Sequence, residues 1–589
     1  MVIRTSFKAA SLHKLPFDIL VNIFEWLSVY DVLALRRTCK VLACVTRDRS
    51  IWHDAFVKQI LSCNKFVPSA LFSGVDYQNE TNLQRFSDRE LEYLTLSSLR
   101  ANKQWTAEKC VCVKKRHVGA AQNERGGYPF KFAPRFLTIK SSEDLFASKD
   151  DGRFLLSVFQ HTNKCGYINY RYSVKVLDLE ARENGYRGSD PWFWMDWNMV
   201  LDSGNGLYYW AANRKGSRKF SGEVFAVRST NYETASILLF EPPGADKQAK
   251  PLKRLKSLNF GCFVELLALN SNLLILSMAS EIIVFDWVKN TRINKDSEEK
   301  VDNCVKLRSR NDIIVSVRVV HDWILVFYQE VLEMFFLPSA ELAKLERKTV
   351  PPRYTFRWDS PIVDLRITER YSWGQKREEA SCARCDGKGF VPNTGHLTRI
   401  CKCRYTPLSV VVFYEAFNRG DGINTIGPEK IDHYTFLPDV FSDQQMTEVA
   451  PVDLPRSWLV KSHVLNAPED LELEPITVGP YGTVLFREFF KSNVGMSEYG
   501  YKNPMMRRYK EESVAISGIM LRGKDEHIHS HAHPSDPTHI TMNRYKKRSS
   551  SGPLETVSLC MNERAGRIAI INDEGITIRE YFNYRKLRN

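Results

Sequence analysis

The sequence predicts a mainly β protein with an α-helical module at its N-terminus. Apolar residues recur at helical spacing in residues 15–52 and again in 86–105. From about residue 130, short runs of β-branched and aromatic residues alternate instead with Gly, Asn, Asp and Ser, which is typical of strands joined by turns. With 589 residues, 43% of them apolar, the chain is long enough to bury more than one core.

The N-terminal module begins at a Leu-Pro pair. Proline is tolerated in the first turn of a helix, so Pro16 marks a helix start. A broad apolar face follows at helical spacing, and two further helical pieces are expected around residues 31–39 and 42–52. Three short helices cannot bury all of these side chains against one another, and the segment has no paired cysteines or metal ligands to staple it. We therefore expect a binding partner to cover part of this module.

This segment resembles the F-box. Leu15-Pro16, Asp18-Ile19-Leu20, Ile23-Phe24, Thr38-Cys39-Lys40 and Trp52 fall where that family's pattern places like residues, so we take residues 1–60 as an F-box three-helix unit. The resemblance implies that the module binds a Skp-type adaptor and, through it, a cullin and a RING subunit. An ordinary helical bundle packed on the rest of the chain is the alternative. The adaptor contacts that the resemblance implies are Leu15, Pro16, Leu20, Ile23, Phe24 and Leu27.

Residues 61–130 are expected to form a helical linker. Within them, residues 86–105 predict one amphipathic helix, because Ser87 and Glu90 have the spacing of a capping box and leucines recur on one side up to Trp105. An F-box followed by such a helix and then by a long β region resembles fungal-type F-box receptors. We expect this helix to brace the F-box against the β region; a free-standing helix is the alternative.

Residues 131–589 are expected to form a degenerate β-propeller. Residues 272–286 give strand, short polar turn and strand, and residues 311–338 repeat that rhythm, which is typical of repeated β architectures. Roughly six to eight blades of four strands would fit this length. The regular Gly-His to Trp-Asp spacing of WD repeats is absent. A tandem of β-sandwiches and leucine-rich repeats are the alternatives.

A small insertion at residues 375–406 carries four cysteines that could hold a metal. Cys382 and Cys385 lie in a Cys-x-x-Cys-x-Gly-x-Gly run that resembles the DnaJ-type zinc knuckle, and Cys401 and Cys403 are expected to complete a tetrahedral thiolate site. The second pair lacks the matching glycines, so His396 is a reserve ligand. We expect a structural zinc here; four reduced cysteines in a loop are the alternative.

A second insertion, residues 524–553, is rich in His and in basic residues. Its histidines at 527, 529, 531 and 533 would lie on one side of an extended chain, where they could bind a metal weakly or respond to pH. Arg544 to Arg548 could serve as a nuclear-import patch. A solvated loop is the alternative reading of both features.

Composition narrows the class of function. A net charge of +14 favours acidic or phosphorylated protein partners, although it could also serve solubility alone. No nucleic-acid-binding module, membrane span, P-loop, nucleophile elbow or His-Glu-x-x-His motif is recognisable. Thirteen cysteines without a signal peptide indicate reduced thiols, hence cytoplasm and/or nucleus.

The function expected from these features is that of a non-catalytic substrate receptor in an SCF-type cullin-RING ubiquitin ligase. The F-box would bind the Skp-type adaptor, and the propeller would bind the substrate. The alternatives are a propeller scaffold that binds the adaptor without a cullin, and an enzyme with its site in the propeller channel.

Overall fold

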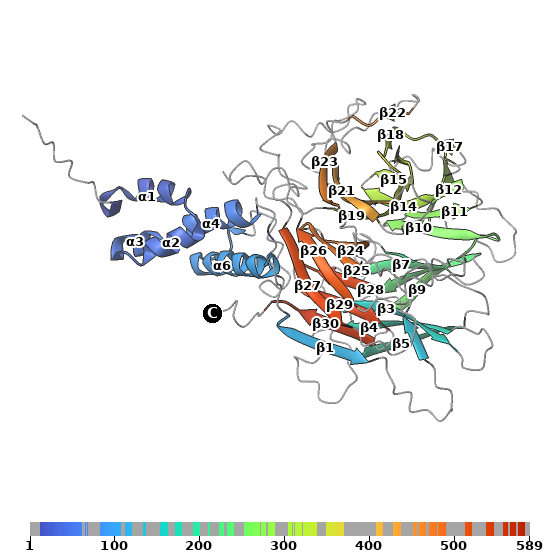
Figure 1. The fold of residues 1–589 in the computed structure, drawn as a ribbon, viewed down its shortest axis with the longest axis horizontal. Coiled ribbons are helices and arrows are strands. Elements are labelled where there is room, and N and C mark those ends of the chain that lie inside the picture. The colour runs from blue at the N-terminus through green and yellow to red at the C-terminus, as the bar shows by residue number, and fades with distance from the viewer. Residues whose placement is uncertain are drawn as a thin grey trace, which may run out of the picture.

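The protein consists of a helical module joined to a ring of β-sheets (Figure 1). In the described part of the chain, no helix is long and apolar enough to cross a membrane. The computed structural model describes residues 12–61, 65, 67–68, 83–107, 112–119, 133–136, 154–162, 171–178, 192–200, 210–212, 223–228, 233–240, 252–270, 273–278, 281–288, 304–308, 310, 312–320, 322–337, 349–369, 408–415, 428–436, 451–455, 459–466, 471–479, 481–490, 513–520, 538–546, 558–563, 566–572 and 575–582.

The helical module is built from short helices and one long helix. Ser28 caps the second helix by accepting a hydrogen bond from the backbone N–H of Asp31, and Asp48 caps the fourth in the same way. The predicted capping box of Ser87 and Glu90 is confirmed at the start of the long helix. The elements are η1 (Leu12–Lys14), α1 (Phe17–Phe24), α2 (Val29–Arg36), α3 (Lys40–Val45), α4 (Arg49–Phe56), the π-helical turn η2 (Val57–Leu61) and α6 (Asp88–Trp105).

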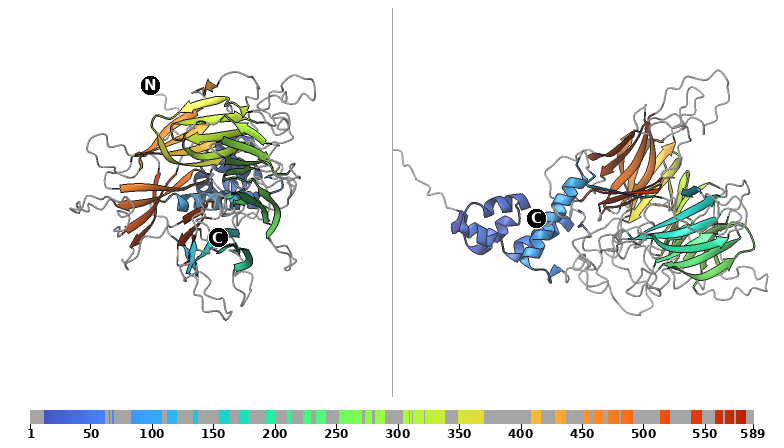
Figure 2. Two further views of the ribbon diagram at one scale, coloured as in Figure 1. Left: turned by 90° about the vertical axis from the view of Figure 1, so that its right-hand side faces the viewer. Right: turned by 90° about the horizontal axis from the view of Figure 1, so that it is seen from below.

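The described strands form seven sheets, which we number as blades in chain order. In blades 1 to 6 the principal strands follow one another in chain order and pair antiparallel, as in a propeller. From blade 2 to blade 7, the first strand of each sheet lies beside the first strand of the next. The left panel of Figure 2 shows the sheets arranged around a common centre. The expected propeller-like architecture is therefore observed, with seven blades.

The first three blades contain the strands β2–β13, with β17 added to the outer edge of blade 3. Blade 1 comprises β2 (Ala133–Phe136), β3 (Phe154–Thr162), β4 (Arg171–Asp178) and β5 (Trp192–Val200); blade 2 comprises β6 (Trp210–Ala212), β7 (Glu223–Arg228), β8 (Thr234–Phe240) and β9 (Leu252–Asn259); blade 3 comprises β10 (Val264–Asn270), β11 (Leu273–Met278), β12 (Glu281–Asp286), β13 (Cys304–Leu307) and β17 (Thr349–Val350).

The next three blades contain most of the strands between residues 314 and 546, and β22 extends the outer edge of blade 4. Blade 4 comprises β14 (Ile314–Val320), β15 (Trp323–Tyr328), β16 (Val331–Phe336), β18 (Tyr354–Arg357) and β22 (Val452–Asp453); blade 5 comprises β19 (Ile362–Glu369), β20 (Leu408–Glu415), β21 (Pro428–Phe436) and β23 (Leu459–Asn466); blade 6 comprises β24 (Leu471–Val478), β25 (Thr483–Phe490), β26 (Ser513–Met520) and β27 (Thr538–Lys546).

Blade 7 joins the two ends of the β region. Its inner strands are β28 (Ser558–Asn562), β29 (Arg567–Asn572) and β30 (Gly575–Glu580), and its outer strand is β1 (Lys114–Gly119), which pairs antiparallel with β30. β1 lies within the range expected to be a helical linker, so the β region begins earlier in the chain than residue 131. A strand from the N-terminal side and a strand from the C-terminal end thus close the same sheet.

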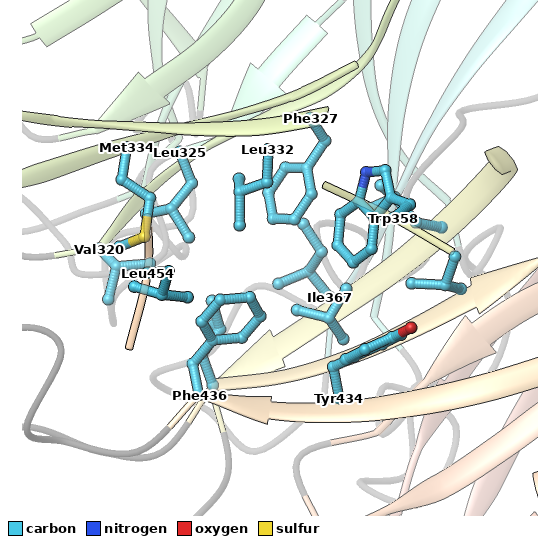
Figure 3. Close-up of a cluster of buried hydrophobic side chains, with 14 of the residues drawn as sticks. Val320, Leu325, Phe327, Leu332, Met334, Trp358, Ile367, Tyr434, Phe436 and Leu454 are labelled. Carbon is cyan, nitrogen blue, oxygen red and sulfur yellow. The ribbon is translucent and has the colours of Figure 1, made fainter. Parts of the chain in front are cut away.

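Adjacent blades pack through apolar faces. Between blades 4 and 5, side chains from the strands of both sheets point toward one another and form a continuous buried cluster (Figure 3). Similar clusters fill the space between blades 2 and 3 and between blades 3 and 4. Strands β15 and β16 are buried on both faces, which explains why β15 reads as an unbroken apolar run; the apolar run of β16 is interrupted only by the buried Glu333. The labelled residues in Figure 3 are Val320, Leu325, Phe327, Leu332, Met334, Trp358, Ile367, Tyr434, Phe436 and Leu454.

Candidate functional site

Helix α1 carries two apolar stripes that face in different directions. Leu20 and Phe24 point into the core of the helical module and are almost fully buried. Ile19 lies on the other side of α1 and Trp26 lies in the turn that follows the helix, and 45% and 86% of their surface is exposed. Ile23 is half-buried and lies between these two residues at helical spacing. We call Ile19, Ile23 and Trp26 the outer stripe. An apolar stripe of this kind on a small module is a surface that a partner would cover.

The structure divides the six residues that were predicted as adaptor contacts. Leu20 and Phe24 contact the module core, Pro16 is exposed as the N-cap residue of α1, and the remaining three are half-buried around the core. Adaptor contact remains a prediction for all six. Ile19 and Trp26 of the outer stripe were not among the predicted adaptor contacts. The helical spacing of Ile19, Ile23 and Trp26 could have indicated that they lie on one side. The half-buried residues of the set are Leu15, Ile23 and Leu27.

Helix α6 belongs to the same core as α1–α4. Leu91 is fully buried in the module cluster. The Arg36 guanidinium donates two hydrogen bonds to the Glu92 carboxylate, at 2.6 and 3.0 Å, and another to the carbonyl oxygen of Thr46, at 2.8 Å. A forked, charge-assisted contact of this type fixes orientation as well as distance. It attaches α2 to α6.

A second arginine ties α4 to the segment that leads into α6. The Arg49 guanidinium donates hydrogen bonds to the carbonyl oxygens of Leu83, at 2.9 Å, and Phe86, at 3.0 Å. The helical module and α6 are therefore joined by polar contacts in addition to their shared apolar core. At 1.5 Å per residue, the 18 residues of α6 extend over about 27 Å, so the helix is long enough to act as an arm.

The far end of α6 is anchored in the propeller by Trp105. Its indole is fully buried, and its Nε1–H donates a hydrogen bond of 2.9 Å to the Thr483 hydroxyl at the start of β25 in blade 6. The same ring makes edge contacts with Tyr581 and Phe582, which follow β30 of blade 7, with ring centroids 5.6 and 5.7 Å apart. We call these four residues the Trp105 joint. The joint connects the arm to two neighbouring blades. The right panel of Figure 2 shows the long helix α6 leading from the other helices toward the β-sheets.

The buried carboxylate of Glu563 holds the backbone next to the Trp105 joint. Glu563 accepts hydrogen bonds from the backbone N–H groups of Tyr481, at 2.7 Å, and Thr483, at 2.8 Å, and so ties blade 7 to blade 6. A Cβ at Gly479 would collide with the Glu563 carboxylate, so a side chain there would displace the carboxylate from these hydrogen bonds. Gly566 has a φ of +56° and lies under the Phe582 ring, so it also excludes a side chain. The hydrogen bonds of Glu563 and the two glycines therefore fix the backbone that Trp105 packs against.

A polar cluster stabilises blade 5 near its boundary with blade 4. The Lys461 ammonium lies 3.1 Å from the fully buried Asp432 carboxylate, also donates a hydrogen bond to Asp359, and sits over the Tyr434 ring. The Tyr434 and Tyr414 hydroxyls are hydrogen-bonded at 2.7 Å. Burial lowers the pKa of Lys461, but the hydrogen bonds to Asp359 and Asp432 outweigh it, so the pKa is raised above its usual value. The lysine thus holds the turn that contains Asp359.

The predicted zinc ligands Cys382, Cys385, Cys401 and Cys403 lie outside the described residues, as do His396 and the histidines at 527, 529, 531 and 533. The structural zinc therefore stays a prediction. Among the residues that the structure does describe, no group of three or more His, Cys, Asp or Glu side chains is placed to hold a metal ion.

Comparison with known proteins bears on both parts of the chain. No curated protein sequence matches it. Solved structures with some likeness include the WD40 domain of SCAP from fission yeast (9% identity, TM-score 0.34, 80% of this chain and 100% of that chain). Another is the Cps50 (Swd1) beta-propeller domain from Myceliophteria thermophila (11% identity, TM-score 0.34, 76% and 99%). These TM-scores are too low to carry an argument, so the propeller assignment rests on the seven sheets described above.

The described residues thus form a small helical module with an exposed apolar stripe, held on the propeller by a buried joint. Residues 12–58 match the family model described as F-box-like, which covers η1 to α4. The chain therefore carries an F-box-like module at residues 12–58, followed by a propeller-like region.

Proposed function

We propose that this chain is the substrate receptor of an SCF-type cullin-RING ubiquitin ligase. In this role the F-box-like module binds a Skp-type adaptor, the adaptor recruits a cullin and its RING subunit, and the propeller binds a protein substrate. The chain itself carries out no chemistry. Cytoplasm and/or nucleus is the compartment that this role expects.

The observation that carries the proposal is the F-box-like match over residues 12–58, together with the exposed outer stripe of that module. An indole that is 86% exposed beside an exposed isoleucine is costly to leave in water, and covering such side chains on binding is favourable. The outer stripe and the half-buried Leu15 give an adaptor an apolar surface to grip. The buried pair Leu20 and Phe24 would keep α1 in the orientation that presents it.

The Trp105 joint supports the proposal in a second way. A ligase receptor must hold its substrate at a defined position relative to the adaptor, and an arm fixed at both ends provides that. Arg36 fixes one end of α6 to the module, and Trp105 fixes the other end to blades 6 and 7. A flexible tether would provide no such fixed position.

Reconstitution with purified subunits tests this role. The full chain is mixed with a Skp-type adaptor, a cullin and a RING subunit, and the mixture is separated by size-exclusion chromatography. We expect one complex that contains all four proteins, and we expect Leu15→Ala/Pro16→Ala to elute alone. Co-elution with the adaptor but not with the cullin would instead support the scaffold alternative.

A further inference from the structure

Three consecutive blades carry an apolar residue at the same position, immediately before the first strand. Phe263 precedes β10 of blade 3, Ile313 precedes β14 of blade 4 and Pro361 precedes β19 of blade 5. Phe263 is 60% exposed and Ile313 is 62% exposed, and Pro361 is half-buried. We call these three residues the loop-face patch. Single exposed apolar residues are ordinary, but their recurrence at equivalent positions of adjacent blades concentrates apolar surface in one region.

The three positions lie at the starts of neighbouring first strands, near the centre of the ring. The first strands β10, β14 and β19 lie side by side. The backbone N–H of Gln329, in the turn between β15 and β16, donates a hydrogen bond of 3.3 Å to the carbonyl oxygen of Ile313. The carbonyl oxygen of Gln329 accepts one of 2.8 Å from the N–H of Ile362, the residue after Pro361. Ile313 and Pro361 therefore flank one turn.

The loop-face patch lies on the face of the propeller opposite the helical module. A first strand runs from one face to the other, so its start and its end lie on opposite faces. The patch precedes the first strands, whereas the Trp105 joint contacts Thr483 at the turn that follows the first strand of blade 6. A molecule bound at the patch would therefore not collide with an adaptor on the module.

The loops that carry the patch are held in place. Phe260 packs its ring against Phe285, and its N–H donates a hydrogen bond of 2.7 Å to the carbonyl oxygen of Glu233. Gly261 adopts a φ of +63°, and its N–H donates to the Asn259 side chain at 3.1 Å. A surface that is ordered before binding loses less entropy when a partner docks.

The charges around the patch are balanced. Among the described residues of these loops, Arg310 pairs with the buried Glu333 at 2.6 Å, and Asp359 pairs with Lys461. Three arginines and three acids share this part of the face, so it does not gather the excess positive charge of the chain. A phosphate needs several converging cations, whereas an apolar segment needs few. The six charged residues are Arg308, Arg310, Asp312, Glu330, Arg357 and Asp359.

We propose that the loop-face patch binds a protein segment through apolar side chains, and that this segment is the part of the substrate that the receptor recognises. The inference rests on the proposed receptor function and names the chemistry of its substrate. The occupant is an extended segment with aromatic or aliphatic anchors. An acidic or phosphorylated segment, which the net charge of the whole chain favours, is the competing occupant.

A synthetic peptide array tests the proposal. The full chain is applied to sets of peptides of equal length that are rich in apolar, acidic or phosphorylated residues, and retained peptides are titrated in solution. The same titrations are made with Phe263→Ser/Ile313→Ser and with Val452→Ser. Val452 is an exposed apolar residue on the outer edge of blade 4, away from the first strands, so it is a matched control.

We expect the apolar set to be retained, and the affinity of its members to fall roughly ten-fold or more in the double variant while Val452→Ser leaves it unchanged. Equal thermal melting of the variants and the wild type would show that the fold is intact. Retention of acidic or phosphorylated peptides alone, equal affinity in the double variant, or retention of no peptide would overturn the proposal. Adaptor titration of the same preparations tests the receptor role separately, so the two can fail independently.

Discussion

Lys461 is the residue on which the polar cluster of blade 5 depends. It faces the fully buried Asp432 carboxylate at 3.1 Å and also reaches Asp359 in the turn between blades 4 and 5. Removing one member of a buried ion pair is costly, because the other charge stays in a medium of low dielectric constant. The raised pKa of Lys461 means that its stabilising contribution is complete at neutral pH and is lost only as the pH rises through that pKa.

Replacing Lys461 by Met should therefore lower the free energy of unfolding by roughly 2–4 kcal/mol, since the lysine is partly exposed and the full cost of a buried pair does not apply. Adding Asp432→Asn to that variant should recover part of the loss, because the buried charge is then gone. Thermal denaturation followed by circular dichroism measures both effects. A double variant that is less stable than Lys461→Met alone would contradict this account.

In the helical module, the helical spacing of apolar residues predicts which residues share a face but not which of them are exposed. The sequence predicts a broad apolar face on α1, and the buried Leu20 and Phe24 lie on it as expected. It does not reveal which edge of that face turns outward, because this depends on where α3, α4 and α6 pack. Trp26 is a large aromatic residue that composition alone would place inside, yet it is the most exposed of the large apolar residues in the described part of the chain.

At the scale of elements, helix α6 connects the helical module to the propeller. One end is fixed to the module by Arg36 and the other to blades 6 and 7 by the Trp105 joint. Most of this helix was predictable, because the capping box and the leucine spacing are local signals. Its partner surface was not, since Thr483 and Phe582 are hundreds of residues away in the sequence and no local pattern links them to Trp105.

Trp105→Ala should loosen this connection and lower stability by about 3–5 kcal/mol, the range for deleting a large buried aromatic side chain. Small-angle X-ray scattering of the full chain should show a wider distribution of interatomic distances, because the helical module is no longer held against the propeller. Thr483→Val is the matched control, since it removes the hydrogen bond and keeps the ring contacts. An unchanged scattering profile for Trp105→Ala would refute a fixed arm.

Strand β1 shows the opposite case, an element that sequence patterns did not reveal. Its sequence, Lys-Lys-Arg-His-Val-Gly, has neither the alternation nor the β-branched run that identified the other strands. It forms because β30 has a free edge along its full length, with which β1 pairs antiparallel from Lys114, opposite Glu580, to Gly119, opposite Gly575. By contrast, the strands predicted within residues 272–286 and 311–338 are observed, as β11 and β12 and as β14, β15 and β16, since buried blade strands carry their own apolar signal.

The cysteine insertion is an element with a separate prediction. We propose that Cys382, Cys385, Cys401 and Cys403 bind one structural zinc, because four thiolates in two close pairs form a tetrahedral site. Elemental analysis should find about one zinc per chain, and Cys382→Ser/Cys385→Ser should abolish it. Loss of the metal should leave the melting of the propeller unchanged. A wild-type protein purified without chelator that holds no zinc would rule the site out.

At the scale of the whole molecule, two apolar surfaces lie at opposite ends of a connected body. The outer stripe of α1 is on the helical module, and the loop-face patch is on the far face of the propeller. Between them run the arm, the Trp105 joint and the apolar contacts between neighbouring blades. Closure of blade 7 by β1 places the start of the propeller next to the joint, so the module enters the ring where the ring is sealed.

The central claim is that the helical module binds a Skp-type adaptor through α1. Calorimetric titration of the adaptor into the full chain tests it most directly, with Leu15→Ala/Pro16→Ala and Ile19→Ser/Trp26→Ser as variants and the distant, exposed Val113→Ser as control. We expect tight binding by the wild type and the control, and a loss of about ten- to thousand-fold in affinity for both double variants. Wild-type affinity in both double variants, or no adaptor binding by the wild type, would contradict the account.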